Sequence, residues 1–320
     1  MRSQQDSAGG LRHLITLEGL SRDALVAILD RAETYRRLPG QPAYEGRELA
    51  GVTLANLFFE PSTRTATSFH LAAQRLSADV LDIKVADSSV KKGETLLDTV
   101  ATFEAMDLSV LIMRTSHAGS PALVAAHSKA SIVNAGDGMH EHPTQGLLDL
   151  FTLKNKYGRI DGLTVAIVGD VLHSRVARSD VWGLLKLGAK VRLCGPPTMC
   201  PADLVKLWPG APVSVTHDLR QALEGVDAVQ MLRLQLERQQ RFLFPSTREY
   251  SQAYALTSEK LAYAKPGALV MHPGPMNRGL EISSGVADGP QSAISTQVAN
   301  GVAVRMAVLY LLAGNEAETA

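Results

Sequence analysis

The stretch LFFEPSTRTATSFHLAAQRL, residues 57–76, decides the fold. An apolar, β-rich run, Val52–Phe59, ends at Glu60-Pro61, and the apolar residues beyond it recur at the i, i+3, i+4, i+7 spacing of an amphipathic helix. A buried strand is therefore predicted to lead directly into a helix. The helical positions that carry this spacing are Phe69, Ala72, Ala73 and Leu76.

The same alternation of short apolar runs and helical patterns extends along almost the whole chain. It is typical of parallel sheets with helices on both faces, and a continuous apolar run such as VAIV (165–168) fits a strand buried on both sides. We therefore predict an α/β fold of two doubly wound parallel-sheet domains joined by interdomain helices. The other strand candidates are Val80–Val85, Ser109–Met113, Ile132–Asn134, Thr164–Val168, Lys190–Leu193, Val213–Thr216, Ala228–Leu232 and Ala268–Met271.

The length of 320 residues is enough for two domains, since a domain has roughly 100–200 residues. A polar, glycine-bearing turn at Lys156–Gly162 marks the boundary between them. We predict a first domain at 1–157, completed by a C-terminal helix at about 295–313, and a second domain at 158–294. The segment Leu14–Arg37 is expected to form an N-terminal helix that follows a loop.

Net charge and cysteine content exclude several classes of protein. The 32 basic and 32 acidic side chains cancel, which leaves no long-range attraction for nucleic acid or an anionic membrane. Cys194 and Cys200 supply neither a disulfide framework nor a zinc set. The N-terminus lacks an apolar signal core, and no stretch approaches the roughly 20 apolar residues of a membrane span. We expect a cytoplasmic protein with reduced thiols.

The turn at Ser62–Thr65 (STRT) predicts a phosphate site. Its hydroxyls and its guanidinium open a helix directly after a buried strand, where free backbone N–H groups and the positive end of the helix dipole also point. Arg64 adds a planar, permanently charged fork. An ordinary N-cap would explain one hydroxyl but not an arginine among them.

Nucleotide and dinucleotide sites find little support in the sequence. The chain contains no G-x-x-x-x-G-K-[ST] loop, and Gly169-Asp170 lacks the further glycines of G-x-G-x-x-G. A NAD-dependent dehydrogenase, which would share the sheet architecture, is therefore disfavoured.

Four further motifs follow the phosphate turn in the order and at spacings compatible with one known family. Nearly the entire chain resembles the aspartate and ornithine carbamoyltransferases, and five motifs in register are far more specific than one. The motifs are FEPSTRT (59–65), KKGET (91–95), MRT (113–115), HPTQ (142–145) and HPGP (272–275).

The resemblance implies acyl transfer from carbamoyl phosphate to an amine. Phosphate is a good leaving group, so the reaction calls for positioning and charge stabilisation, without a metal or cofactor. By similarity, Thr65, Arg114 and His142 surround the carbamoyl oxygen, and Gln145 holds the carbamoyl amide. The residues implied to hold the phosphate are Ser62, Thr63, Arg64, Thr65 and Arg114, and those implied to be catalytic are Arg64, Thr65, Arg114 and His142.

The polar, lysine-bearing segment Asp87–Glu94 reads as a surface loop. The resemblance implies that Ser88 and Lys92 reach the active site of the adjacent subunit in a homotrimer, where both contact carbamoyl phosphate. Whether a regulatory chain or a dihydroorotase joins the trimer is left open by the sequence.

An acceptor with two carboxylates needs at least two cationic partners, for which bidentate arginine is best suited. By resemblance, Arg175 contacts the α-carboxylate of L-aspartate, while Arg233 and Gln235 take its side-chain carboxylate with help from Lys92. Arg178 is left outside this set. The loop implied to orient the attacking amine contains Pro273, Gly274 and Pro275.

Three alternatives compete with an aspartate carbamoyltransferase function. Ornithine enzymes of the family are expected to carry Ser-Met-Gly and H-C-L-P, which this chain lacks, so the resemblance favours aspartate and pyrimidine synthesis. A weakly active scaffolding paralogue is the second alternative. The third is a metal site at His140-Glu141-His142, which fails the H-E-x-x-H zinc pattern because residue 144 is threonine.

Overall fold

The structure is a computed structural model of two α/β units, each built on a parallel sheet. This agrees with the predicted fold class. The structure describes residues 4–84, 95–234 and 244–317.

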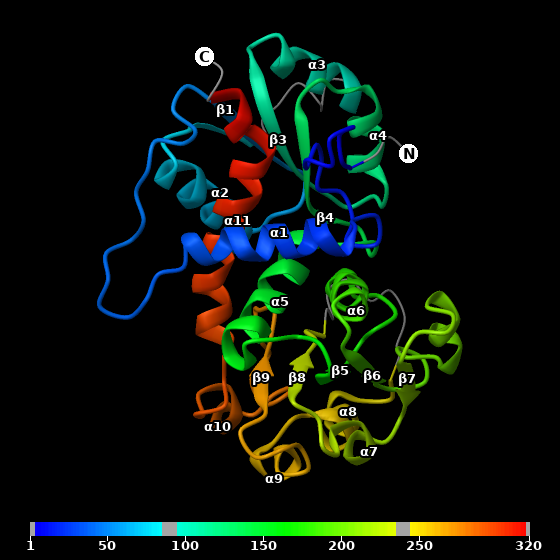
Figure 1. The fold of residues 1–320 in the computed structure, drawn as a ribbon. Coiled ribbons are helices and arrows are strands. Elements are labelled where there is room, and N and C mark those ends of the chain that lie inside the picture. The colour runs from blue at the N-terminus through cyan, green and yellow to red at the C-terminus, as the bar shows by residue number, and fades with distance from the viewer. Residues whose placement is uncertain (1–3, 85–94, 235–243, 318–320) are drawn as a thin grey trace. The chain divides into compact units, whose positions relative to one another are not determined.

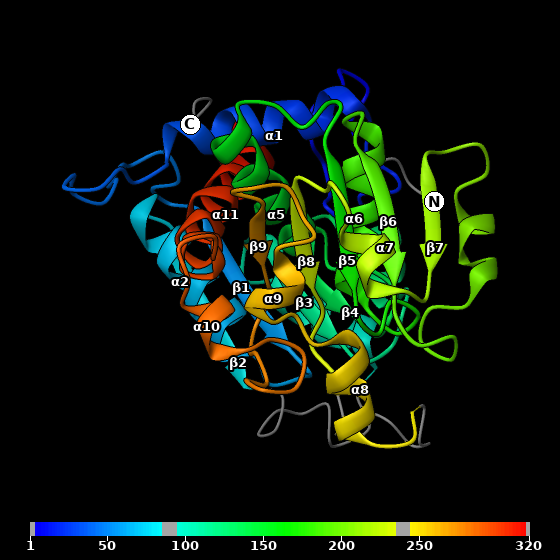
Figure 2. The same cartoon turned by 90° about the horizontal axis from the view of Figure 1, so that it is seen from below.

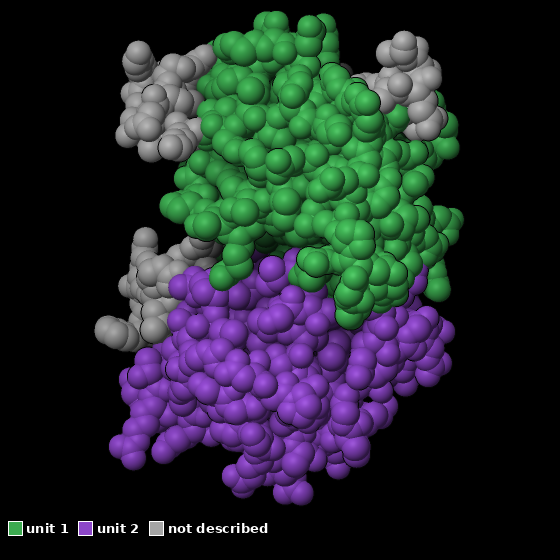
Figure 3. Space-filling model, turned by 90° about the vertical axis from the view of Figure 1, so that its left-hand side faces the viewer, with its two compact units in different colours: residues 1–151, 299–320 green, residues 152–298 purple. Residues whose placement is uncertain are grey.

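The chain divides into two compact units, which Figure 3 shows in two colours. Unit 1 comprises residues 1–151 and 299–320, and unit 2 comprises residues 152–298. Helices α5 (Pro143–Tyr157) and α11 (Ile294–Ala317) each contain residues of both units. The division thus falls inside α5, whereas the predicted boundary between 157 and 158 falls at the end of that helix.

Unit 1 is built on a parallel four-stranded sheet of order β2-β1-β3-β4. Figure 1 shows α2 and α11 on one side of this sheet and α3 and α4 on the other. The strands are β1 (Thr53–Phe58), β2 (Asp79–Lys84), β3 (Leu108–Thr115) and β4 (Ser131–Asp137); the helices are α1 (Arg22–Thr34), α2 (Thr63–Arg75), α3 (Leu96–Glu104) and α4 (Ser120–His127).

Alternating side chains of the unit 1 strands fill two separate layers. Leu111 and Met113 of β3 pack with Val100 of α3 and Val124 of α4. On the face that α2 covers, Asp82 of β2 accepts a hydrogen bond from Asn56 of β1 at 2.7 Å and pairs with His70 of α2 at 2.8 Å. The sheet is therefore covered on both faces, as the continuous apolar runs predict.

Unit 2 is built on a parallel five-stranded sheet of order β7-β6-β5-β8-β9, which Figure 2 shows in that sequence. Its largest apolar cluster joins β5, β6, β8 and β9 to α7, α9 and α10. The strands are β5 (Thr164–Val168), β6 (Lys190–Cys194), β7 (Val213–Thr216), β8 (Ala228–Met231) and β9 (Leu269–Met271); the helices are α6 (Arg175–Lys186), η3 (Ala202–Leu207), α7 (Leu219–Leu223), α8 (Thr247–Tyr254), α9 (Ser258–Leu261) and α10 (Ser284–Ala287).

Each sheet has one point at which the direction of winding reverses. In unit 1 the chain leaves β1 for β2 on one side and then returns to β3 on the other side of β1. In unit 2 it leaves β5 for β6 on one side and later enters β8 on the other side of β5. Ligands of doubly wound proteins bind beyond the carboxyl ends of strands at such points.

The predicted strands are all present among the described residues, with ends that differ by three residues at most. The predicted helix at Leu14–Arg37, however, is wrong in its first part, because α1 begins at Arg22. Leu14 instead lies alongside β4, where its N–H donates to Ile132 and its carbonyl accepts from Asn134, both at 2.8 Å.

The prediction that no stretch could span a membrane is also wrong as stated. Among the described residues one segment, Ile294–Gly314 of α11, is long and apolar enough to cross a bilayer by length and composition alone. Its most apolar window is 78% buried inside the protein. The apolarity of α11 is therefore that of a core helix.

Two valines of α11 test this role of the helix. Val304 is fully buried, whereas Val298 is 57% exposed. Val304→Ala should lower the free energy of unfolding by about 1.5–3 kcal/mol, because it removes buried methyl groups and leaves a cavity. Val298→Ala makes the same change at an exposed position and should stay within about 0.5 kcal/mol of the parent in urea unfolding. Equal losses would show that α11 is not a core helix.

Candidate active site

The amino end of α2 lies directly beyond β1, as predicted. Ser62 is the N-cap residue, and its carbonyl accepts the Ala66 N–H at 3.1 Å. Within the part of the chain that the structure describes, its hydroxyl makes no capping hydrogen bond. The local N-cap explanation for this serine therefore does not hold, and the side chain remains available to a ligand. Thr63 and Arg64 are exposed, while Thr65 is buried.

Arg114 lies at the carboxyl end of β3, next to the α2 turn. Its carbonyl accepts the Phe59 N–H at 2.8 Å, which fixes the end of β1 beside it. Its Nη1 donates to the Ala135 carbonyl of β4 at 3.4 Å, and its Nε lies 3.5 Å from a carboxylate oxygen of Glu60. The guanidinium is thus held at the reversal point of the sheet by groups from both neighbouring strands.

The loop between β4 and α5 presents His142 and Gln145. Both are buried, at 5% and 9% exposure. The His142 carbonyl accepts the N–H groups of Gln145 and Gly146 in the first turn of α5, so His142 lies at the positive end of a helix. Gln145 Nε2 donates to both oxygens of Asp149 one turn later, at 3.0 and 3.2 Å. This fixes the orientation of the Gln145 amide.

A cation from the C-terminal helix supports Asp149. Arg305 of α11 is 4% exposed, and its guanidinium lies 5.1 Å from the centre of the Phe69 ring of α2. Burial lowers the pKa of Arg305 to about 10, against the opposing effect of the Asp149 charge. Arg305, Asp149 and Gln145 thus form a buried polar series that ends at the candidate site.

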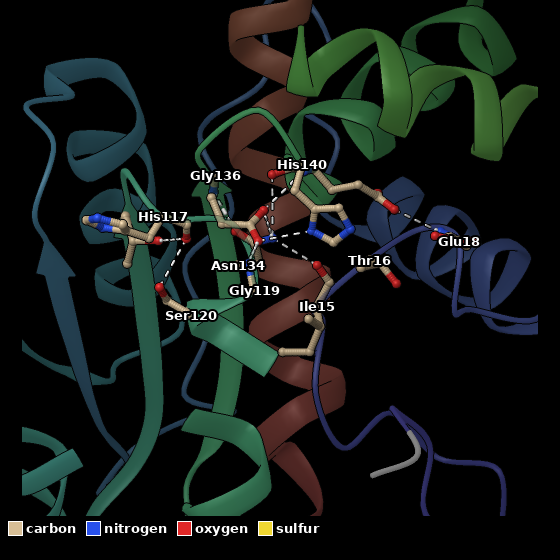
Figure 4. A network of polar contacts seen from close by, with 12 residues as sticks. Ile15, Thr16, Glu18, His117, Gly119, Ser120, Asn134, Gly136 and His140 are labelled. Carbon is tan, nitrogen blue, oxygen red and sulfur yellow. Dashed lines mark hydrogen bonds and ion pairs between the residues drawn. The ribbon is translucent and has the colours of Figure 1, made fainter. Parts of the chain in front are cut away.

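The loops that follow β3 and β4 are joined by a network of polar contacts, which Figure 4 shows with Gly119, Asn134 and His140 labelled; Asp137 contacts all three. This carboxylate is fully buried and accepts hydrogen bonds from Gly119, Asn134, His140 and Glu141. Burial alone would raise the pKa of Asp137, but these hydrogen bonds outweigh it and hold the pKa below its ordinary value of 3.8. The group is therefore ionised at neutral pH.

In unit 2, the end of β5 leads into a tight turn and then α6. Gly169 has φ +134, and a β-carbon there would lie 3.0 Å from that of Leu232, so the ends of β5 and β8 approach closely. The buried Asp170 accepts from His173 Nδ1 at 2.8 Å. The Ser174 hydroxyl caps α6 by accepting the Ala177 N–H. Arg175, the first residue of α6, is 5% exposed.

Arg233 follows β8, on the opposite side of the unit 2 reversal point. It is half-buried, and the carbonyl of the next residue, Leu234, accepts from Asn277 Nδ2 at 3.1 Å. Arg175 and Arg233 are thus brought to the carboxyl ends of adjacent strands. This is the placement that a site for an acceptor with two carboxylates requires.

The loop Pro273–Pro275 follows β9 and is held by the buried pair His272 and Glu281. His272 Nδ1 accepts the Gly274 N–H at 2.8 Å, and its Nε2 lies 3.2 Å from a Glu281 oxygen. The first contact requires Nδ1 to be unprotonated, so Nε2–H is the donor to Glu281. Gln297 fixes the base of the loop by accepting the His272 N–H at 2.9 Å.

The structure groups most of the predicted residues but cannot place all of them. Ser62, Thr63, Arg64, Thr65, Arg114, His142 and Gln145 lie at the carboxyl edge of the unit 1 sheet, and Arg175, Arg233, Pro273, Gly274 and Pro275 at that of unit 2. Arg178 Nη2 lies 3.5 Å from the carbonyl of Leu172, in the turn that precedes α6. Ser88, Lys92 and Gln235 lie outside the described residues.

Sequence reasoning gave no role to several carboxylates that support these groups, namely Glu60, Asp137, Asp149 and Glu281. Asp149 had a readable signal, because it stands four residues after Gln145 and so shares its face of a helix. Glu60 stands inside the phosphate motif itself. Asp137 and Glu281 act through contacts between loops, for which the sequence offers no spacing rule.

One group of side chains meets the distance criterion for a metal site. Ligand atoms of Glu18, His140 and Glu141 lie within 4.8 Å of one another. However, the two Glu141 oxygens accept the N–H groups of Leu17 and Glu18, at 2.8 and 3.2 Å. We therefore interpret this group as an anchor between the N-terminal segment and the loop before His142.

Comparison with known proteins assigns the chain to a family. Residues 12–155 match the carbamoyl phosphate-binding domain of the aspartate/ornithine carbamoyltransferases, and residues 161–312 match their aspartate/ornithine-binding domain. The chain belongs to the aspartate/ornithine carbamoyltransferase family. The predicted resemblance is thereby confirmed.

The curated relatives narrow the family further. The chain is 52% identical over 312 residues to the aspartate carbamoyltransferase catalytic subunit of Geobacter sulfurreducens, covering 97% of this chain and 99% of the relative. It is 53% identical over 303 residues to the catalytic subunit of the same name from Moorella thermoacetica, covering 95% and 97%.

Solved structures of both branches of the family share the fold. The aspartate transcarbamoylase of Trypanosoma cruzi, in complex with carbamoyl phosphate and aspartate, matches with a TM-score of 0.85 at 31% identity, covering 94% of this chain and 96% of that one. The ornithine carbamoyltransferase of Pyrococcus furiosus matches with a TM-score of 0.84 at 27% identity, covering 98% of each chain.

Substitution of Arg305 tests the buried polar series formed by Arg305, Asp149 and Gln145. Arg305→Met removes the cation that offsets the buried Asp149 charge and should cost about 3–5 kcal/mol of unfolding free energy. The double variant Arg305→Met/Asp149→Asn should recover part of this loss in urea unfolding. As a control, Arg31 lies 4.0 Å from the Tyr310 ring of the same helix. Arg31→Met should cost only about 0.5–1 kcal/mol. Similar losses for both arginines would contradict the series.

Proposed function

We propose that the protein is an aspartate carbamoyltransferase. It transfers the carbamoyl group of carbamoyl phosphate to the amine of L-aspartate and yields N-carbamoyl-L-aspartate and phosphate, as in pyrimidine synthesis. The observation that carries the proposal is that both sheets hold the family's motif residues at their points of reversed winding. The catalytic subunits at 52–53% identity support the choice of aspartate.

The donor is held by unit 1 residues. The amino end of α2 offers backbone N–H groups and the hydroxyls of Ser62, Thr63 and Thr65 to the phosphate. Arg64 and Arg114 neutralise the dianion from two sides. Since the whole chain has no net charge, this local cluster provides the attraction for phosphate.

The carbonyl of the donor is activated by groups that follow β1, β3 and β4 at the carboxyl edge of the sheet. Arg114, His142 and the Thr65 hydroxyl stabilise the charge that develops on oxygen in the tetrahedral intermediate. Gln145 donates through Nε2 to Asp149, so its Oε1 is directed outward as an acceptor for the carbamoyl NH₂ group. The protein thus fixes the donor through both its oxygen and its nitrogen.

The acceptor is held by unit 2 residues. Arg175 binds the α-carboxylate and Arg233 the side-chain carboxylate, with Gln235 and the neighbour's Lys92 assisting. The carbonyls of the Pro273–Pro275 loop orient the amine. Ornithine would place an ammonium group against Arg233, and that repulsion disfavours it. Attack of the neutral amine on the carbonyl carbon forms the C–N bond, after which the C–O bond to phosphate breaks and the departing phosphate accepts the amine proton.

Product formation tests the proposal directly. The purified chain should form ureido product from carbamoyl phosphate with L-aspartate and give no turnover with L-ornithine. Arg114→Met should lower kcat by at least about 10²-fold, because it removes a charge that stabilises the transition state. Turnover with ornithine instead of aspartate would overturn the assigned acceptor. Turnover with neither would overturn the enzyme function.

The proposal extends to assembly and location. We assign the chain to a homotrimer with shared active sites in the cytoplasm, where Ser88 and Lys92 of one subunit serve the site of the next. The naming of the relatives as catalytic subunits supports an assembly. Cys194 and Cys200 are free and buried, and burial raises the pKa of each thiol to about 12, which fits structural thiols of a reducing compartment.

Mixing of two inactive variants tests whether sites are shared. Lys92→Met and Arg114→Met should each be inactive alone. After dissociation and reassembly together, random assortment should restore up to about a quarter of the sites, since a hybrid interface combines intact Arg114 from one subunit with intact Lys92 from the next. Activity that stays at the level of the separate variants would show that each site is built by one chain.

A further inference from the structure

Asp137, the last residue of β4, uses both of its carboxylate oxygens to join separate segments. Oδ1 accepts from Asn134 Nδ2 at 2.9 Å and from the Glu141 N–H at 3.0 Å. Oδ2 accepts from the Gly119 N–H at 2.8 Å and from His140 Nδ1 at 3.0 Å. An ionised, buried carboxylate with four donors is a strong and geometrically specific junction.

The segments that meet at Asp137 are the two that present Arg114 and His142. Gly119 ends the loop that follows Arg114, and His140 and Glu141 directly precede His142. A second contact, from the Gly138 N–H to the Thr115 carbonyl at 2.9 Å, runs beside the first. The carboxylate therefore sets the spacing between the backbone after Arg114 and the backbone before His142.

The same network reaches the N-terminal segment. Asn134 Nδ2 also donates to the Ile15 carbonyl at 2.9 Å, and Asn134 Oδ1 accepts the Gly136 N–H at 2.8 Å. Figure 4 shows His117 and Ser120 on one side of Asn134 and His140, Ile15 and Glu18 on the other. Among the described residues, the carboxylates of Glu18 and Glu141 lie near His140, with ligand atoms of the three side chains within 4.8 Å of one another.

A purely structural role would not require this position. Glu104 is a similar clamp at the opposite end of the same strand, where one of its oxygens accepts the N–H groups of Lys129 and Ala130 at 2.7 and 3.1 Å and the Ser128 hydroxyl. Hydrogen bonds hold the pKa of Glu104 below its ordinary value despite its burial. The two carboxylates differ in that Asp137 alone of the pair lies at the edge that carries Arg114 and His142.

We infer that Asp137 is a positioning residue for carbamoyl transfer, which aligns Arg114 and His142 on the carbonyl of the donor through the Gly119 and His140 contacts. This role rests on the proposed function. It adds to that function a group, Asp137, that contacts neither substrate but sets the positions of Arg114 and His142.

The substitution Asp137→Asn isolates this role. The amide oxygen can keep the contacts to Asn134 and Glu141, but the NH₂ group would face the two donors Gly119 N–H and His140 Nδ1–H. The link between the two loops is therefore broken, while the packing volume is preserved. A displacement of the order of an ångström at the reacting groups is expected to lower kcat about 10- to 100-fold.

The experiment measures kcat, the KM for aspartate and the melting temperature of the parent, Asp137→Asn and Glu104→Gln. Asp137→Asn should lose kcat as stated and keep the KM for aspartate within about threefold, because unit 2 holds the acceptor. Glu104→Gln should keep kcat within about twofold of the parent, even if its melting temperature falls as much as that of Asp137→Asn. A folded Asp137→Asn with parental kcat, or equal kcat losses in both variants at equal melting temperature, would overturn the role.

If Asp137→Asn fails to fold, His140→Ala decides, since the His140 side chain is 30% exposed and its removal deletes one of the four donors. Loss of that hydrogen bond should lower kcat about fivefold with an unchanged KM for aspartate, and parental kcat would overturn the role. A parent protein that is itself inactive with aspartate would instead overturn the proposed function, and with it this role.

Discussion

The structure depends on one constraint of parallel sheets: strands that pair side by side end at the same edge, whatever the distance between them in the sequence. In unit 1 this places the turn after β1, Arg114 after β3 and the loop after β4 together, although these residues span more than a quarter of the chain. Because winding reverses between β1 and β3, the described helices α2 and α3 lie on opposite faces of the sheet. The amino end of α2 begins at this edge, and its free N–H groups suit an anion.

In each unit, buried or half-buried carboxylates hold the residues at the carboxyl edge of the sheet. In unit 1, carboxylates hold the residues that we propose to bind the donor. Glu60 lies beside Arg114, and Asp149 orients Gln145. Asp137 joins the loop after Arg114 to the loop before His142. In unit 2, Glu281 plays a similar part through His272. A neutral protein can thus present a strongly cationic site, because its balancing anions are placed behind the cations.

Strand positions and motif residues were predictable from the sequence because each depends on local patterns. Apolar runs that must be buried on both faces leave little ambiguity, and a hydroxyl-rich turn with an arginine is informative where it follows such a run. The segment from Leu14 misled because its apolar residues are spaced as in a helix, while its backbone groups pair with β4. Asp137 carried no signal, since its meaning comes from Gly119, a residue 18 positions away that only folding brings near.

The discontinuity of unit 1 has a consequence for biosynthesis. Residues 299–320 belong to unit 1 but are synthesised after all of unit 2. The nascent first unit therefore lacks the contact between Phe69 and Arg305 until α11 has been made. A premature stop anywhere in unit 2 would release a chain whose first sheet lacks its final cover, and such chains expose apolar surface that quality control can recognise. Helix α11 thus makes the completion of unit 1 depend on the synthesis of unit 2.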